Sequence, residues 1–389
     1  MNMFRQAGAV TLMNLRGIPD RRAASLVVVI GMAAVVAVVT SVLAMSTGFL
    51  ATVGKTGRAD RAIVLSVGAI SFGSSSLPRE TIPFITDAPG VRRDADGKSI
   101  ASADVFATME MVKKSDGLFA PATLHGVGPQ ALKTFPQIRL LSGRMFNPAL
   151  HELIAGRLAQ TQFDGFAVGD KISLPEGDWT IVGNFESHGD QHESELIGDA
   201  ETIMSAYQRT AFNSTTVMLD SAEAFATFST ALSANPALKL QVVRESDYFA
   251  KLSKPFNDFL TLVAYAVGGI MGLGAMLGAL NTMYAAVSGR AVEIATLRAI
   301  GFGPGPVVAS VMAEILLLTF AGAVIGIGLA WLAFDGKLAF SDYYIYPLTV
   351  GAPLIGLGVA IAAAIGLAGG LFPAIRAARQ PVAAAFRAH

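Results

Sequence analysis

Four long stretches of the chain are almost free of charged residues, and segments of mixed polarity separate them. Each stretch exceeds the roughly 20 apolar residues that a helix needs to cross the hydrocarbon core of a bilayer. The pattern predicts four transmembrane helices, at residues 23–54, 256–289, 304–334 and 346–375.

The segment between the first two predicted helices, residues 55–255, has a different pattern. Short alternating runs separated by Gly- and Pro-containing turns are typical of β-strands. We expect strands at Ala62–Val67, Ile138–Leu141, Lys171–Leu174 and Trp179–Val182. The expected fold class is a membrane protein with four transmembrane α-helices and a large α+β extracytoplasmic domain, the outer domain, inserted between helices 1 and 2.

Two local patterns add detail to this domain. Asp220 followed by Glu223 resembles a capping box and predicts a helix that ends at Asn235-Pro236. The side chains that this helix should bury are Phe225, Phe228 and Leu232. The Gly- and Ser-rich stretch Ser71–Ser76 predicts a flexible loop.

The composition agrees with a membrane protein. Charged residues make up 15% of the chain, whereas soluble domains carry about 25%. The net charge of zero gives no indication of nucleic-acid binding. The sequence contains no cysteine, which excludes disulfides and thiolate metal sites.

Basic residues flank the predicted helices unevenly. They lie before the first helix, between the second and third, and after the fourth, at Arg5, Arg16, Arg21, Arg22, Arg290, Arg298, Arg376, Arg379 and Arg387. The short loop at residues 335–345 is slightly acidic. Because cytoplasmic loops are enriched in Lys and Arg, we expect both termini, including the tail at 376–389, in the cytoplasm. Residues 1–22 form either an amphipathic helix in the inner membrane interface or a frayed terminus.

Residues 290–303, between the second and third helices, are expected to form a short cytoplasmic helix. Its polar side chains are Arg290, Glu293 and Arg298, and its apolar side chains at helical spacing are Ile294, Leu297 and Ile300. Gly301 should end the helix in a left-handed conformation. We interpret this segment as a docking element for a cytoplasmic partner. The alternative is an ordinary solvated loop that obeys the positive-inside rule.

Two features inside the spans carry further predictions. Glycines recur at a spacing of four, at Gly268, Gly272, Gly274, Gly278, Gly322 and Gly326. This spacing favours close helix packing, including packing between two copies of the chain, although glycine is also common in membrane helices. Glu314 is an acid well inside the third span. We interpret it as a structural hydrogen-bonding group, with a role in proton transfer as the alternative.

Residues with catalytic or metal-binding chemistry are few. His188, Asp190, His192, Glu193 and Glu195 have metal-ligating side chains. Their polar surroundings and Gly189 favour a solvated loop, so we predict no metal and no cofactor. Gly54-Lys55-Thr56 lacks the upstream glycine of a phosphate-binding loop, and we do not expect ATP binding there. No Ser-His-acid arrangement is readable, which predicts a non-catalytic subunit.

Several segments together resemble one family, the MacB/FtsX-type (type VII) ABC transporter permeases. Arg290, Glu293-Ile294 and Leu297-Arg298-Ala299-Ile300-Gly301 resemble the loop between spans two and three of these proteins. Phe372-Pro373-Ala374 with Arg376-Ala377-Ala378 resembles the family's ending. The outer domain shows similar turn motifs, at Leu141-Ser142-Gly143-Arg144, Gly156, Gly169-Asp170 and Val182-Gly183. One span, a large outer domain and three further spans is also the family's layout.

The resemblance implies partners and a mechanism. Such permeases form homodimers or related heterodimers and bind two copies of a cytoplasmic ABC ATPase, whose groove receives the loop helix. The helix at 256–289 is longer than the bilayer is thick, and we expect its excess length to form a stalk that rises into the outer domain. ATP-driven closure then moves the stalks and outer domains of such permeases, which is called mechanotransmission. Only 22 residues precede the first span, so we expect the ATPase in trans. The implied location is the bacterial inner membrane, with lipids and a periplasmic adaptor or lipoprotein as further partners.

Two functional hypotheses follow. The leading one is a permease subunit of an ABC export or extraction system. The alternative is an FtsX-like regulatory membrane scaffold whose outer domain activates a periplasmic cell-wall hydrolase. The size of the outer domain, residues 55–255, favours transport. An intramembrane enzyme has little support, because Glu314 has no paired base in the spans.

Overall fold

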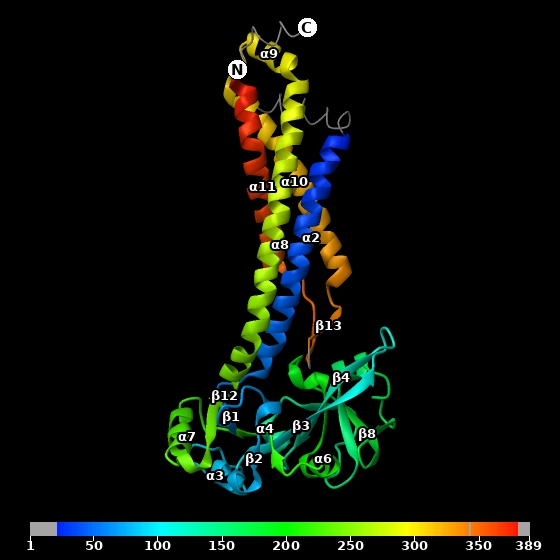
Figure 1. Cartoon of the computed structure of the whole chain (residues 1–389), viewed down its shortest axis with the longest axis vertical. Coiled ribbons are helices and arrows are strands. Elements are labelled where there is room, and N and C mark those ends of the chain that lie inside the picture. The colour runs from blue at the N-terminus through cyan, green and yellow to red at the C-terminus, as the bar shows by residue number, and fades with distance from the viewer. Residues whose placement is uncertain (1–21, 342–343, 380–389) are drawn as a thin grey trace. The chain divides into compact units, whose positions relative to one another are not determined.

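The computed structural model of the chain describes residues 22–341 and 344–379 (Figure 1). These residues form two compact units. The helical unit comprises residues 22–47, 258–337 and 348–379, and the outer-domain unit comprises residues 48–257, 338–341 and 344–347. The expected interfacial helix at residues 1–22 and the expected tail at 376–389 lie largely outside the described residues.

Four described helices are long and apolar enough to cross a membrane (Figure 1). They are α2 (Arg22–Thr56), α8 (Glu245–Gly289), α10 (Pro304–Phe334) and α11 (Ala352–Arg379). A helix satisfies its backbone hydrogen bonds internally, so an uncharged run can be stable in lipid in this form. Within the helical unit, Met32 and Val36 of α2 pack with Ala323 of α10 and Ala362 of α11. The predicted number of spans and the predicted fold class are confirmed.

Helix α8 begins earlier than the apolar pattern indicates. It has 45 residues and starts at Glu245, whereas we expected the span to start at residue 256. Glu245 and Asp247 lie in its first turn, where negative charge suits the helix dipole. At 1.5 Å per residue the helix is about 68 Å long, compared with a hydrocarbon thickness of roughly 30 Å. Hydropathy finds only the apolar part of such a helix.

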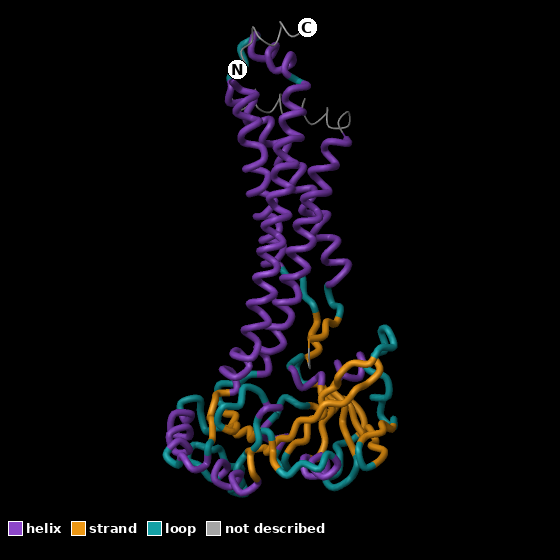
Figure 2. The backbone as a smooth tube through the Cα atoms, viewed as in Figure 1, coloured by secondary structure: helices purple, strands orange, loops and turns teal. Residues whose placement is uncertain are grey.

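The outer domain is built on a ten-stranded mixed sheet, drawn as orange strands in Figure 2. Its strand order is β12-β1-β11-β3-β4-β9-β6-β8-β5, with β7 paired to β8. The strands are β1 (Arg61–Ser66), β3 (Ala101–Val112), β4 (Phe119–Val127), β5 (Arg139–Gly143), β6 (Glu152–Gly156), β7 (Lys171–Leu174), β8 (Gly177–Glu186), β9 (Glu195–Asp199), β11 (Ser214–Met218) and β12 (Leu240–Arg244). Most pairs are antiparallel, and β4–β9 and β6–β8 are parallel.

Short helices cover this sheet and complete the α+β domain. They are α3 (Ile82–Thr86), α4 (Ala131–Thr134), α5 (Arg157–Gln162), α6 (Ala200–Ala206) and α7 (Ala224–Ser233), with single 3-10 turns at η2 (Phe72–Ser74), η3 (Arg79–Thr81), η4 (Gln191–Ser194) and η5 (Pro236–Leu238). Strands β2 (Leu77–Pro78) and β10 (Ala211–Phe212) form a separate small sheet. The core contains large, fully buried side chains such as Trp179, Phe163 and Phe228.

All four predicted strands are present, as β1, β5, β7 and β8. The longest of the described strands, β3, was not predicted because small residues and the charged Asp104 and Glu110 interrupt its apolar positions. Burial of its small side chains against β4 and β11 stabilises it, and the sequence alone does not reveal those neighbours.

Two local predictions in this domain were wrong. Glu223, not Asp220, is the N-cap of α7, and it makes no side-chain capping bond. Phe228 and Leu232 are nevertheless buried, as expected, and Phe225 is partly buried. The stretch Ser71–Ser76 is an ordered turn: Ser71 and Ser74 form a capping box around η2, and the buried Ser75 hydroxyl accepts a hydrogen bond from the Ser66 backbone N–H.

The expected short loop at residues 335–345 contains a hairpin. Strands β13 (Leu338–Ser341) and β14 (Tyr344–Pro347) pair in antiparallel register. Both strands belong to the outer-domain unit. Ile345 is buried in the core of the outer domain, and the Tyr346 ring contacts Phe49 edge-on at 5.3 Å between centroids. The sequence does not indicate this hairpin, because each of its strands is too short to show a β-pattern.

Candidate coupling site

The predicted docking segment forms a helix, α9 (Ala291–Ala299), between α8 and α10. Arg290 is its N-cap residue, and Gly301 follows its end with φ +99°. The Gly301 N–H donates to the Arg298 carbonyl and the Phe302 N–H donates to the Leu297 carbonyl, both at 3.1 Å. These two bonds define a Schellman motif, which needs a left-handed residue at the glycine position. The predicted left-handed end of this helix is therefore present.

The first end of α9 is attached to α10 by an ion pair. The Arg290 Nη1 atom donates to the Glu314 Oε2 atom at 3.2 Å. Both side chains are buried, at 8% and 7% exposure. Breaking such a buried pair by removing one partner is strongly destabilising. Glu314 thus lies at a helix interface, against a residue of the docking segment.

The last turn of α9 is attached to α11. The Arg298 Nη1 atom donates to the Ala378 carbonyl at 2.8 Å, one residue before α11 ends. In addition, the Arg376 guanidinium lies 5.5 Å from the centroid of the Tyr284 ring of α8, a cation–π distance. Arg298 and Arg376 therefore hold α8, α9 and α11 together, besides providing positive charge.

The apolar side of α9 is only partly available to a partner. Ile294 is buried in a cluster with Met283 and Val287 of α8 and Val307 and Val311 of α10. Leu297 is half-buried. The side chains of Glu293, Thr296 and Ile300 are exposed, Ile300 at 69%. Their spacing of three and four residues places them on one face, which we call the outward face of α9.

Of the glycines predicted to pack helices together, four face a neighbouring helix of the same chain and two face open space. A Cβ atom on Gly322 would lie 2.7 Å from the Val29 carbonyl, and one on Gly326 would lie 2.5 Å from the Ala33 carbonyl. Both glycines therefore let α10 contact the α2 backbone within one chain. Similarly, a Cβ on Gly268 would lie 2.5 Å from Val39, and one on Gly272 would lie 3.4 Å from Ile365. Gly274 and Gly278 have no atom within 4 Å of such a Cβ.

The acidic and histidine residues at 188–195 are not in a solvated loop, and that interpretation was wrong. Of these, Asp190, His192, Glu193 and Glu195 are all buried. The Glu193 carboxylate is satisfied inside the domain: it pairs with Arg157 at 3.0 Å and accepts the Ser187 and Gly189 backbone N–H groups. His188 is exposed at φ +53°. Local composition misled the prediction because the charged partner of Glu193, Arg157, is 36 residues away in the sequence.

His125, in β4, is a further member of this buried group that the sequence did not indicate. Its Nδ1 atom lies 2.9 Å from Glu195 Oε2, although 70 residues separate the two. Burial lowers the pKa of His125, but the charges of Glu195 and Asp104 and the hydrogen bond with Glu195 outweigh this and raise it to about 9. No local pattern marks such a pair, since a lone histidine in a strand is usually a core residue.

Comparisons with known proteins cover both units of the structure. The MacB-like periplasmic core domain matches residues 24–235, more than half of the chain, and the FtsX-like permease C-terminal matches residues 265–382. The chain belongs to the MacB/FtsX family of ABC transporter permeases. This family consists of membrane permease subunits, and its layout agrees with the four candidate spans of this multi-pass bacterial membrane protein.

Individual relatives of this MacB/FtsX permease are distant. The macrolide export ATP-binding/permease protein MacB of Neisseria gonorrhoeae is 30% identical over 121 residues, which cover 31% of this chain and 17% of that protein. MacB of Sodalis glossinidius is 32% identical over 137 residues, which cover 34% of this chain and 20% of that protein. The uncharacterized ABC transporter permease YknZ of Bacillus subtilis is 26% identical over 139 residues, covering 36% and 34%. The chain thus spans about a third or less of the length of these relatives.

Two solved structures of outer domains are similar to this permease. The periplasmic region of MacB from Actinobacillus actinomycetemcomitans covers 53% of this chain and 97% of its own, at 13% identity and a TM-score of 0.38. The extracellular domain of a YknZ transporter from Gram-positive bacteria covers 47% of this chain and 99% of its own, at 14% identity and a TM-score of 0.35.

Proposed function

We propose that this permease passes ATP-driven movement from a cytoplasmic ABC ATPase to its outer domain, as the membrane subunit of an export or extraction system. The observation that supports this most is the double attachment of α9. Arg290 joins its first end to Glu314 of α10, and Arg298 joins its last turn to the α11 backbone. A force on α9 would therefore act on membrane helices rather than bend a loop.

The docking surface in this proposal is the outward face of α9. Glu293 supplies a charged contact and Ile300 an exposed apolar one. Ile294 anchors α9 to its own helices, since its side chain is buried there. Arg290, Leu297, Arg298 and Gly301 likewise fix the position and the end of α9. This division assigns recognition and anchoring to different residues of the same short helix.

The proposal includes a second copy of the chain and a fixed orientation. The basic flanks of the spans favour cytoplasmic termini and a cytoplasmic α9. The exposed apolar side of α8, which includes Gly274, is the surface proposed for the second copy. The permease itself would be non-catalytic, with the ATPase supplying hydrolysis. A periplasmic adaptor or a lipoprotein is the expected partner of the outer domain.

The test is charge reversal on the outward face of α9. The variant Glu293→Arg should fold and insert normally, because this side chain is exposed. We expect at least a tenfold loss of ATPase stimulation in nanodiscs that contain the permease and the ABC ATPase that copurifies with it. Asp178→Arg, the same reversal at an exposed position of the outer domain, should leave stimulation unchanged.

Normal stimulation and normal transport by Glu293→Arg would contradict the docking role of α9. The regulatory alternative has a separate readout. If affinity capture with the full chain recovers a cell-wall hydrolase on the periplasmic side, and no adaptor, channel or lipoprotein, the outer domain regulates an enzyme and does not move cargo.

A further inference from the structure

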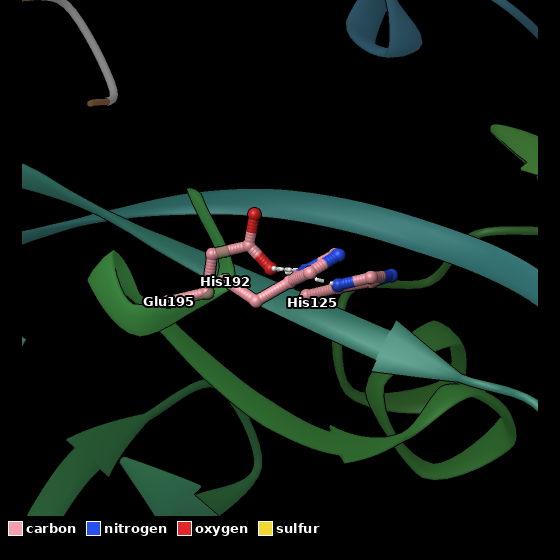
Figure 3. Close-up of side chains that lie close together, drawn as sticks. All are labelled: His125, His192 and Glu195. Carbon is pink, nitrogen blue, oxygen red and sulfur yellow. Dashed lines mark hydrogen bonds and ion pairs between the residues drawn. The ribbon is translucent and has the colours of Figure 1, made fainter. Parts of the chain in front are cut away.

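Three ligand-type side chains converge on one point inside the outer domain (Figure 3). His125 lies in β4, His192 in η4, and Glu195 begins β9. The Nδ1 atoms of His125 and His192 lie 2.9 Å and 3.0 Å from the same carboxylate oxygen, Oε2 of Glu195. One ligand atom from each side chain lies within 4.8 Å of the other two, and all three residues are buried.

Neighbouring residues hold these side chains in position. The Gln191 Nε2 atom donates to Glu195 Oε1 at 3.0 Å, which leaves Oε2 directed at the two rings. On the far side of the His125 ring, Nε2 faces Asp104 Oδ1 at 3.6 Å. Asp104 is itself held by the hydroxyls of Ser102 and Thr216, at 2.5 Å and 2.9 Å. A carboxylate behind a histidine is the usual support of a metal-bound imidazole, because it fixes the ring and its tautomer.

We propose that His125, His192 and Glu195 bind a divalent transition-metal ion, with Zn²⁺ as the best match, through Nδ1, Nδ1 and Oε2. Two imidazole nitrogens and one carboxylate oxygen are a common ligand set for Zn²⁺, whose fourth position is then filled by water. Bonds of about 2.0–2.2 Å place the ligand atoms of a tetrahedral Zn²⁺ roughly 3–3.5 Å apart. The two separations between a histidine Nδ1 atom and Glu195 Oε2, 2.9 Å and 3.0 Å, are close to this range, and the two histidine ligand atoms lie within 4.8 Å of each other.

Hydrogen bonds alone account for this cluster less well. Hydrogen bonds from both Nδ1 atoms would satisfy Glu195 Oε2, but they leave the Nε2 atoms of both rings without a hydrogen-bond partner in the core. Unsatisfied buried polar atoms are costly. With a metal at Nδ1, the His125 Nε2–H points toward Asp104, and a charge of +2 offsets the two buried carboxylates of Glu195 and Asp104.

Such an ion would fix the connection between two parts of the sheet. Turn η4 follows β8, and β9 pairs with β4 in parallel register. A metal bound by all three elements would stabilise the outer domain by binding its folded state and not its unfolded state. This inference is independent of the coupling function proposed for α9, and neither result bears on the other.

The test measures metal binding directly. The full chain, purified in detergent with a tag that contains no histidine, is treated with EDTA and dialysed against Zn²⁺. We expect one Zn²⁺ per chain by elemental analysis, and Co²⁺ in its place should give the intense visible absorption of a tetrahedral site. Zn²⁺ at about 100 times its dissociation constant should raise the melting temperature of the outer domain by about 5–10 °C.

Matched variants separate this site from surface binding. His192→Gln and Glu195→Gln should lose the bound Zn²⁺, the Co²⁺ spectrum and the thermal shift. His188→Asn removes an exposed histidine four residues before His192, at a left-handed position that Asn tolerates, and should keep all three. If a variant fails to fold, the EDTA-treated natural chain still decides the question through its response to Zn²⁺.

Less than a tenth of an equivalent of Zn²⁺ on the natural chain, without a Co²⁺ spectrum, would overturn the proposal. Equal binding by the natural chain and by a folded His192→Gln variant would also overturn it. In either case the cluster is an ion pair between imidazolium groups and a carboxylate.

Discussion

At the scale of single residues, the ion pair between Arg290 and Glu314 links α9 to the membrane-spanning helix α10. The sequence suggested a structural role for Glu314, and the structure places it 3.2 Å from Arg290. The position of this partner matters more than its charge. An acid paired within a span would only stabilise the helix bundle, whereas an acid paired with the N-cap of α9 also connects α9 to α10.

Replacing both members of this pair should separate stability from coupling. Glu314→Met leaves the buried Arg290 without its carboxylate partner and should lower the free energy of unfolding by about 3–5 kcal/mol. The double variant Arg290→Met/Glu314→Met should recover most of that loss, because hydrophobic residues of similar size replace both charges. We expect the double variant to bind the ATPase but to transmit poorly, as measured by thermal unfolding and by ATPase-coupled activity in nanodiscs. Full recovery of activity along with stability would show that the pair serves folding only.

The residues that the sequence failed to identify share one property, which is distance along the chain. His125 meets Glu195 across 70 residues, and Arg61 meets Glu245 across 184, in a fully buried ion pair with a distance of 2.7 Å. Nothing in the flanking residues indicates either contact, since the sheet order that creates it is not local. By contrast, the left-handed Gly301 could be predicted, because a helix end is decided by neighbouring residues.

At the scale of elements, the helices were easier to predict than the sheet. A span must be apolar along its whole length, so hydropathy finds it, as for α10 at Pro304–Phe334. Strand β3 carries small residues on both faces and was missed, whereas β7 was found with its observed bounds, Lys171–Leu174. The cap predicted for α7 was wrong. Asp220 and Glu223 have the spacing of a capping box, but the N-cap residue of the helix is Glu223, which has helical backbone angles.

The glycines of α10 provide a prediction at this scale. Gly326→Ala would place a Cβ atom 2.5 Å from the Ala33 carbonyl, and backbone cannot move aside as a flexible side chain can. We expect a loss of about 1–3 kcal/mol, the usual cost of overpacking. Gly328→Ala, two residues away and without an atom within 4 Å of its Cβ, should be neutral or slightly stabilising.

Thermal unfolding of both variants in the same detergent measures the difference directly. A melting temperature for Gly326→Ala equal to that of Gly328→Ala would mean that α2 and α10 do not pack as described. Since the Gly328→Ala variant introduces the same methyl group into the same helix, it controls for any change in helix propensity.

At the scale of the whole molecule, the four spans are covered unequally by their own chain. In its most apolar part, α8 is 17% buried, compared with 44% for α2 and α10. Its exposed side chains include Phe259, Leu262, Ile270, Leu273 and Leu277, which follow a helical repeat. Lipid or another protein can cover such a stripe in a membrane. We propose that a second copy of the chain covers it, because Gly274, on the same side, would allow a close approach.

Because the natural sequence contains no cysteine, this assignment can be tested with single thiols in an otherwise unchanged chain. Gly274→Cys has room for its side chain and should form disulfide-linked dimers in membranes on mild oxidation, since symmetry brings the same position of two copies together. Val324→Cys, 53% exposed on α10, is the matched control and should remain monomeric on denaturing gels. Equal cross-linking at both positions would indicate random collision. Failure at 274 and at the neighbouring positions 270 and 277, in membranes where the permease stimulates its ATPase, would place the second copy on another face and leave α8 to the lipid.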